Sequence, residues 1–271
     1  MYLLKLVIVP TGSLLFRRIP FATTVFPTYP FAPPTALAGF LRRLVMLAHG
    51  HELPGDIRGK PKRALNEDAQ FYTLPPDYVC LGAYPSAYTT HRTKRHQPWG
   101  AAAKFGHFKF SALRYVEDKD NKLNAQIPIW EYLHTERMTG YVVHEQREPL
   151  EQLRALENWG GKLGKEGYAF IESVSEVVEL QGPQRRKAKP ATPIPAEALG
   201  SEPANFFTLY AYNWKTQDAP EPTSAEGVPG NGILIQPFLA AWVQEEIELE
   251  YYTDGQEYFP KAWIDKLRGG A

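Results

Sequence analysis

The sequence predicts an α+β fold, namely a ferredoxin-like or RRM-like domain with an inserted β-hairpin and a β-rich C-terminal elaboration. The hydrophobic pattern up to residue 180 gives elements in the order β-α-β, β-β, α and β. Beyond it, two proline-rich stretches separate short β-prone segments. We therefore expect a domain over residues 1–180, an insertion at about 85–126, and a β-rich region over 181–271.

A strand, a proline-rich loop and a helix open the chain. The apolar run Tyr2–Val9 predicts a buried strand. Prolines between Pro20 and Pro34 exclude a helix interior or a central strand there, and Pro33 and Pro34 suit the first turn of a helix that begins near Thr35. The apolar face of this helix comprises Leu37, Phe40, Leu41, Leu44 and Val45, and Arg42 and Arg43 lie on the other face.

The middle of the chain alternates strands with one helix. We expect strands at Tyr78–Tyr84, Ile127–Leu133, Thr139–His144 and Tyr168–Leu180. Residues 85–126, with a turn at Asp118–Lys122, fit a projecting hairpin. Glu148–Trp159 predicts a helix that Gly160 ends, with Leu150, Leu153, Leu156 and Trp159 on one face.

The C-terminal region reads as three strands and two connectors. Residues 181–204 and 216–232 are rich in proline or glycine and are expected to be connectors, so the basic run Arg185–Lys189 is expected to be a solvated linker. Strands are expected at Phe206–Trp214, Ile233–Phe238 and Val243–Tyr252.

Composition excludes several classes of site. Cys80 is the only cysteine, so the chain has no intrachain disulfide and no thiolate zinc site, and a reducing cytoplasm is the simplest location. The apolar N-terminal run is too short to span a bilayer and contains Lys5, so no membrane association is expected. His49 and His51 alone are a weak metal signal, and we expect neither a metal nor a cofactor.

Charge is distributed unevenly along the chain although the net charge is zero. Residues 1–116 contain 15 Lys and Arg against 5 Asp and Glu, and residues 117–271 contain 15 against 25. This asymmetry suggests a nucleic-acid face in the first part and a protein-facing side in the second. The alternative is that folding mixes the two parts and leaves an ordinary surface.

One basic window also carries aromatic residues. Between Tyr78 and Val116 there is no acidic residue. Cations neutralise phosphates and flat rings stack on unpaired bases, so this combination is typical of single-stranded RNA binding. The alternative is a core role for the phenylalanines and a solvated face for the charges. The candidate RNA contacts here are His91, Arg92, Lys94, Arg95, His96, Trp99, Lys104, Phe105, His107 and Lys109.

Two motifs resemble a known superfamily. Residues 29–39, YPFAPPTALAG, resemble the YPFPPPSALxG segment of CRISPR-associated RAMP proteins of the Cas-five class. Residues 160–167, GGKLGKEG, are similar to the glycine-rich loop of RAMP proteins. Together the motifs cover the N-terminal two-thirds of the chain.

The resemblance implies a RAMP domain that caps the 5′ handle of the guide RNA in a type I Cascade complex. It implies that the window above is a β-hairpin thumb. It also implies as partners the backbone RAMP subunit and the large subunit, with target DNA contacted only indirectly, in a prokaryotic cytoplasm. Further candidate RNA contacts are Arg17, Arg18, Tyr29, Thr35, Arg42, Arg43, Gly161, Lys162, Gly164 and Lys165.

Three alternatives remain open at this point. Some relatives cleave CRISPR repeats without metal, and Tyr88, His91, His96 and His107 supply suitable residue types. Their spacing defines no catalytic group, so we expect no catalysis. The chain also fits the equivalent cap subunit of a type III complex, or a protein-interaction scaffold whose basic part is incidental.

Overall fold

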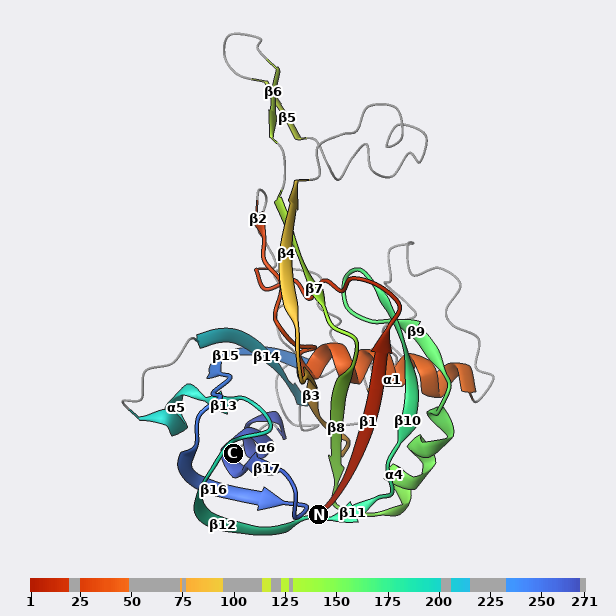
Figure 1. Cartoon of the computed structure of the whole chain (residues 1–271), viewed down its shortest axis with the longest axis vertical. Coiled ribbons are helices and arrows are strands. Elements are labelled where there is room, and N and C mark those ends of the chain that lie inside the picture. Colours follow the sequence, from red (N-terminus) through yellow and green to blue (C-terminus); the bar gives the residue numbers. More distant parts are fainter. Residues whose placement is uncertain are drawn as a thin grey trace.

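A six-stranded sheet forms the centre of the molecule. The computed structural model describes residues 1–19, 25–48, 74, 77–94, 114–117, 123–126, 129–200, 206–214 and 233–268. The main sheet has the order β3 (Val79–Pro85), β8 (Met138–His144), β1 (Tyr2–Pro10), β10 (Tyr168–Val174), β9 (Gly160–Lys162), and β11 (Val178–Glu179) pairs with the start of β1 (Figure 1). Every pairing in this sheet is antiparallel. The mixed α and β composition with antiparallel sheets agrees with the predicted class.

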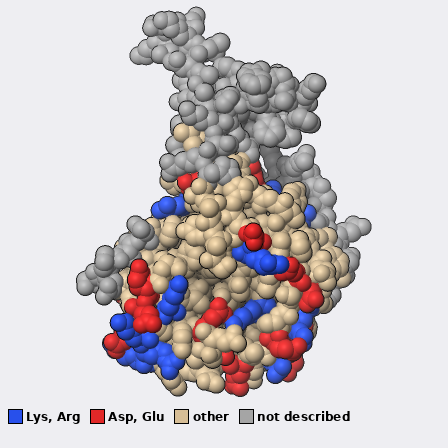
Figure 2. All heavy atoms as spheres, in the orientation of Figure 1, with Lys and Arg blue, Asp and Glu red and all other residues tan. Residues whose placement is uncertain are grey.

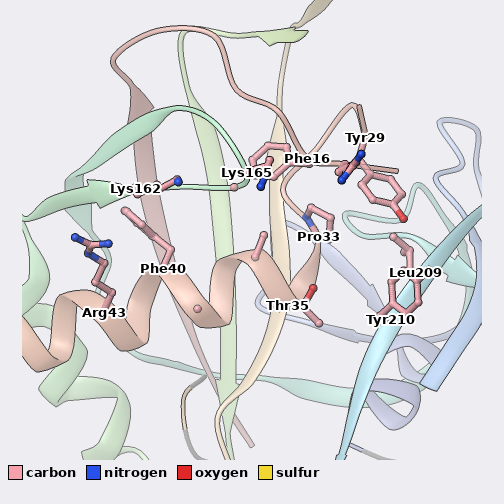
Figure 3. Close-up of a pocket in the computed structure, with 14 residues that line it drawn as sticks. Phe16, Tyr29, Pro33, Thr35, Phe40, Arg43, Lys162, Lys165, Leu209 and Tyr210 are labelled. Carbon is pink, nitrogen blue, oxygen red and sulfur yellow. The ribbon is translucent and has the colours of Figure 1, made fainter. Parts of the chain in front are cut away.

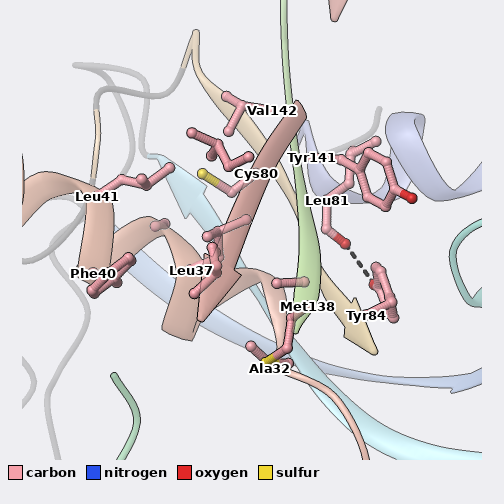
Figure 4. Packing of buried hydrophobic residues seen from close by; sticks show 14 of the residues in the cluster. Ala32, Leu37, Phe40, Leu41, Cys80, Leu81, Tyr84, Met138, Tyr141 and Val142 are labelled. Atoms are coloured by element: carbon pink, nitrogen blue, oxygen red, sulfur yellow. Dashed lines mark hydrogen bonds between the residues drawn. The ribbon is translucent and has the colours of Figure 1, made fainter. Parts of the chain in front are cut away.

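Two helices cover one face of this sheet. They are α1 (Pro34–Ala48) and α4 (Glu148–Leu153), and α4 continues into a 3-10 turn at Arg154–Leu156 that contacts α1. The predicted apolar face of α1 is buried at Leu37, Phe40 and Leu41 (Figure 4). The thiol of Cys80 lies in the same core, where burial raises its pKa.

A second group of strands extends away from the main sheet (Figure 1). It comprises β4 (Thr89–Lys94) and β7 (Ile129–His134), which are antiparallel, β2 (Val25–Phe26), which is parallel to β7, and the hairpin of β5 (Arg114–Glu117) and β6 (Leu123–Gln126). Of these strands, β4, β5 and β6 fall within the insertion expected at 85–126, and β2 and β7 lie outside it.

The C-terminal region forms two three-stranded sheets. One contains β12 (Gln181–Ala188), β16 (Ile247–Thr253) and β17 (Tyr258–Pro260), and the other β13 (Ile194–Pro195), β15 (Ile233–Ala241) and β14 (Phe206–Trp214). Short helices α5 (Ala196–Leu199) and α6 (Lys261–Leu267) accompany them.

The expectation of a connector over 181–204 is wrong. The main chain of β12 pairs with β16, and Arg185 forms a salt bridge with Glu248 on the opposite strand, at 3.0 Å between Nε and Oε1. The basic run is therefore part of an exposed strand. A strand that is solvated on both faces has no apolar alternation, so its sequence resembles that of a linker.

Two expected boundaries also differ from the structure. Helix α4 and its 3-10 turn end at Leu156, Asn158 adopts a positive φ of 67°, and Gly160 begins β9 instead of capping a helix. Trp159 consequently leaves the predicted buried face and is 38% exposed. The strand expected over Tyr168–Leu180 is divided near Ser175, whose hydroxyl accepts a hydrogen bond from the amide of Lys5.

The C-terminal sheets pack against the main sheet in a common core. Phe259, Trp263 and Ile264 are fully buried in the cluster that contains β1 and α1. The indole N–H of Trp263 donates to the carbonyl of Leu81 in β3 over 3.1 Å. The division of the chain into a domain over residues 1–180 and a β-rich region over 181–271 stays a prediction. Among the described helices, none is long and apolar enough to cross a membrane.

Candidate nucleic-acid interface

A cavity of about 460 Å³ lies where the proline-rich loop, the start of α1, the turn after β9 and strand β14 meet (Figure 3). This volume falls within the range of small-ligand pockets. Seven predicted RNA contacts from three distant segments of the sequence line it. They are Arg17, Tyr29, Thr35, Arg43, Lys162, Gly164 and Lys165.

The lining of the cavity is cationic. Arg17, Arg43, Lys162 and Lys165 contribute to it, and no Asp or Glu does. Among the described residues, Lys162 and Lys165 form no salt bridge, and the buried Nε–H of Arg43 has no hydrogen-bond acceptor. The guanidinium of Arg17 lies 4.6 Å from the ring centroid of Phe26, which orients it. Four cations with no carboxylate among them favour an anionic ligand.

The floor of the cavity is one face of α1. Ala36, Gly39, Phe40 and Arg43 lie on this face at helical spacing, and Phe16 closes one side. The methyl group of Ala36 and the absence of a side chain at Gly39 leave a shallow apolar surface beneath the cations. A flat ring therefore has an apolar surface to rest on, next to groups that bind phosphate.

The amides at the start of α1 offer few free hydrogen-bond donors to a ligand in the cavity. Pro34 has no amide hydrogen, and the amides of Ala36 and Leu37 both donate to the carbonyl of Pro33, over 2.9 and 3.0 Å. This leaves at most the amide and the hydroxyl of Thr35 for a ligand. The side chains, more than the helix end, define the site.

The glycines of the turn after β9 make room for protein rather than for RNA. A Cβ on Gly164, whose φ is +80°, would lie 2.8 Å from both the carbonyl oxygen of Leu15 and the ring of Phe16. A Cβ on Gly161 would meet Leu44 of α1 at 3.3 Å. The glycines let the turn approach the core closely, and this approach brings Lys162 and Lys165 to the cavity.

Tyr29 is a buried anchor at the edge of the cavity. It is 3% exposed, and its hydroxyl donates to the carbonyl of Thr208 in β14. Its ring packs near Phe31 and Phe207, with centroids 5.7 and 6.0 Å away. Burial raises the pKa of Tyr29. Its ring is therefore committed to the core and does not offer a free face to a base.

Three predicted contacts lie outside this cavity. Arg18 stacks over Phe207, 4.7 Å from the ring centroid, and donates to the carbonyl of Phe206 over 3.4 Å. Arg42 and Gly161 do not line the cavity. Arg18 and Tyr29 thus both attach the proline-rich loop to β14.

The predicted thumb contacts can be located only in part. His91, Arg92 and Lys94 belong to β4, where they pair in register with Tyr132, Glu131 and Ile129. Arg95, His96, Trp99, Lys104, Phe105, His107 and Lys109 lie outside the described residues.

Sequence reasoning missed β14 as part of the site. Leu209 and Tyr210 of this strand line the cavity opposite α1. About 180 residues separate them from Tyr29 in the proline-rich loop, and no local pattern predicts such a contact. Tyr88, a candidate for the ribonuclease alternative, is 44% exposed and stacks on Trp242. The described residues contain no group of three or more His, Cys, Asp or Glu that could hold a metal ion.

The face of the molecule shown in Figure 2 mixes both signs of charge. Lys5 of β1 forms salt bridges with Asp254 and Glu257. Folding thus brings a cation of the first part of the chain to carboxylates of the second, as the alternative of mixed charge requires.

Comparison with solved structures returns CRISPR-associated proteins. A chain of the type III-B Cmr-beta complex bound to cognate target RNA and AMPPnP aligns with 90% of this chain and 85% of its own, at 12% identity and a TM-score of 0.43. A CRISPR protein from Archaeoglobus fulgidus aligns over 95% and 97%, at 14% identity and a TM-score of 0.37. A chain of a CRISPR RNA-guided surveillance complex aligns over 98% of both chains, at 12% identity and a TM-score of 0.30.

No family model matches the chain, and no curated protein matches it either. With TM-scores below 0.5, the structural similarities define neither its family nor its function.

Proposed function

We propose that this chain is a non-catalytic RNA-binding subunit of a type I CRISPR surveillance complex, and that it caps the 5′ handle of the guide RNA. The observation that carries the proposal is the cavity, where seven residues selected from the sequence alone converge with four cations and no carboxylate. The motif that resembles the Cas-five class forms one of its walls, at Tyr29–Gly39, and the motif that is similar to the glycine-rich loop of RAMP proteins forms another, at Lys162–Lys165.

The fold supports the same proposal. The elements β1, α1, β3, β8, α4 and β10 follow one another as β-α-β-β-α-β, and their strands lie in the order β3-β8-β1-β10. This is the arrangement of a ferredoxin-like unit. In this proposal the strands β4 to β7 are the base of the thumb, and the acidic C-terminal strands face neighbouring subunits of the complex.

The first test is the identity of the RNA that co-purifies with the tagged chain from its native host. Guide RNAs with a common repeat-derived 5′ end are expected. Random RNA or none would overturn the proposal and favour a protein scaffold.

The second test measures RNA affinity after removal of two cations of the cavity. Lys162→Ala combined with Lys165→Ala should weaken binding at least tenfold, since a hydrogen bond to a charged group contributes about 1.5–3 kcal/mol. The dependence of log K on log salt should also become shallower by about 1.4, the value for two phosphate contacts on a single strand.

Lys187→Ala is the matched control, because this exposed lysine lies in β12 and does not line the cavity. It should change neither the affinity nor the salt dependence. An equal loss in the control and the double variant would show that binding depends only on overall charge.

A further inference from the structure

Strand β14 ends its sheet at the cavity. The sheet has the order β13-β15-β14, so β14 pairs with β15 on one side only. The main-chain groups on the other side of an edge strand are available for other partners. Which groups point there depends on the register with β15.

Pro237 fixes this register. Tyr210 pairs directly with Pro237 in the antiparallel ladder. Residues of an antiparallel ladder alternate between pairs that exchange hydrogen bonds and pairs that do not, and proline has no N–H to exchange. Tyr210 and Pro237 therefore form a non-hydrogen-bonded pair. The N–H and C=O of Tyr210 must point away from β15, toward the free edge.

Thr208 and Phe206, two and four positions before Tyr210, have the same main-chain orientation, and the carbonyl of each has a hydrogen-bond partner. The carbonyl of Thr208 accepts from the hydroxyl of Tyr29, and the carbonyl of Phe206 accepts from Arg18. The proline-rich loop thus covers the free edge as far as Thr208. Among the described residues, none bonds the outward N–H and C=O of Tyr210.

The cavity meets the strand along this edge. Leu209 and Tyr210 both line it, although consecutive side chains of a strand point to opposite faces. Leu209 is 1% exposed and its N–H and C=O point toward β15, so the strand borders the cavity mainly through Tyr210, which is partly exposed. The outward N–H and C=O of Tyr210 thus lie at the edge of the cavity that Lys162 and Lys165 also line.

We propose that this edge holds the base of one unpaired nucleotide of the bound RNA, an inference that rests on the function proposed above. A hydrogen-bond donor and an acceptor lie side by side on the pairing edge of every base, so the N–H and C=O of Tyr210 can pair with any of the four. The cations of the cavity bind the adjoining phosphates. The site recognises an extruded base without selecting its identity.

A peptide strand added to this edge fits the site less well. Strand addition uses a run of free main-chain groups, but the carbonyls at Phe206 and Thr208 already have partners. A peptide also brings no phosphate to the four cations. The four cations of the cavity therefore favour a nucleotide.

The test compares Tyr210→Pro with Tyr210→Ala in the full chain, using a fluorescent single-stranded oligoribonucleotide of mixed sequence. Both variants lose the phenol ring, but only proline loses the N–H. Proline is tolerated at an edge strand where its nitrogen faces outward. Tyr210→Pro should bind about 3- to 10-fold more weakly than Tyr210→Ala, the effect of one hydrogen bond.

A second arm keeps the wild-type protein and removes one base at a time from the oligonucleotide. One abasic position should weaken binding about tenfold or more, and replacing the base there by any other should not. Equal affinity of the two Tyr210 variants would overturn the inference. If the proline variant fails to fold, the absence of any sensitive abasic position would overturn it instead.

The two proposals fail in different ways. If the wild-type chain binds RNA and loses it in the Lys162 and Lys165 double variant, the proposed function stands whatever the Tyr210 variants do. If the wild-type chain binds no RNA, both proposals are wrong.

Discussion

Gly164 illustrates how a single residue positions the cations of the cavity. Its φ is +80°, and an added Cβ would lie 2.8 Å from the carbonyl oxygen of Leu15, so there is no space for a side chain. Gly164→Ala should lower the free energy of unfolding by about 2–4 kcal/mol, because backbone strain adds to a steric clash. Urea denaturation followed by circular dichroism measures this loss.

Gly255 is the matched control for that substitution. Its φ is +94°, but a Cβ there meets nothing within 4 Å. Gly255→Ala should therefore cost only the strain, about 1–2 kcal/mol. Equal losses at the two glycines would show that the close approach of the turn to Leu15 contributes nothing.

Tyr29 joins two elements, the proline-rich loop and β14. Tyr29→Phe keeps the ring in the core but leaves the carbonyl of Thr208 without its donor. We expect a loss of about 0.5–1.5 kcal/mol in the free energy of unfolding, the usual net contribution of one hydrogen bond. Tyr168→Phe is the control, since that ring is 59% exposed, and it should change stability by less than about 0.5 kcal/mol. The same loss in both variants would contradict an anchoring role.

Elements with a strong local pattern were predictable from the sequence. The amphipathic helix from Pro34 and the apolar strands β1 and β8 lie where they were expected, because burial of one face leaves a clear period in the sequence. Strand β12 was missed because both of its faces are solvated. The division of β10 and β11 depends on a bond between Ser175 and Lys5, a contact that no local pattern encodes.

The candidate site was predictable to the extent that its residues belong to motifs. Arg17, Arg43 and Lys162, each selected from the sequence as a candidate RNA contact, line one cavity, and their contact with RNA stays a prediction. The proposed contact of the Tyr210 main chain with a base could not be predicted from the sequence. It depends on the orientation of this main chain and on Pro237, which lies 27 positions further along the chain. Such a role is visible only in the strand register.

At the scale of the whole molecule, a small ionic network attaches the C-terminal sheets to the main sheet. The ammonium of Lys5 in β1 lies 2.5 Å from a carboxylate oxygen of Asp254 and 2.6 Å from one of Glu257, and Tyr141 donates to Glu257 over 2.6 Å. Burial alone would raise the pKa of Asp254, but hydrogen bonds from Lys5 and from the amides of Glu257 and Gln256 lower it. The folded state therefore favours the ionised carboxylate.

The lowered pKa of Asp254 gives a pH dependence of stability. Its contribution is complete above its ordinary pKa of 3.8 and is lost as the pH falls through the lower value of the folded state. Asp254→Asn should remove about 2 kcal/mol of unfolding free energy at pH 7. The variant should also lose less stability than the wild type between pH 7 and pH 3, as urea denaturation at both values would show.

Asp265→Asn is the control for this network, because Asp265 pairs with Lys261 on the surface and is 44% exposed. Exposed pairs contribute about 0–1 kcal/mol. A pH dependence that is unchanged in Asp254→Asn would assign the acid sensitivity to other carboxylates.

The position of β1 has a consequence for how the chain folds during synthesis. Residues 2–10 leave the ribosome well before their partners, which are β8, at 138–144, and β10, at 168–174. At 5–20 residues per second, β1 waits on the order of ten seconds for its first neighbour. Its unpaired edges and its apolar side chains are open to wrong partners for that time, so the nascent chain should depend on chaperones more than a protein of the same stability with local pairing.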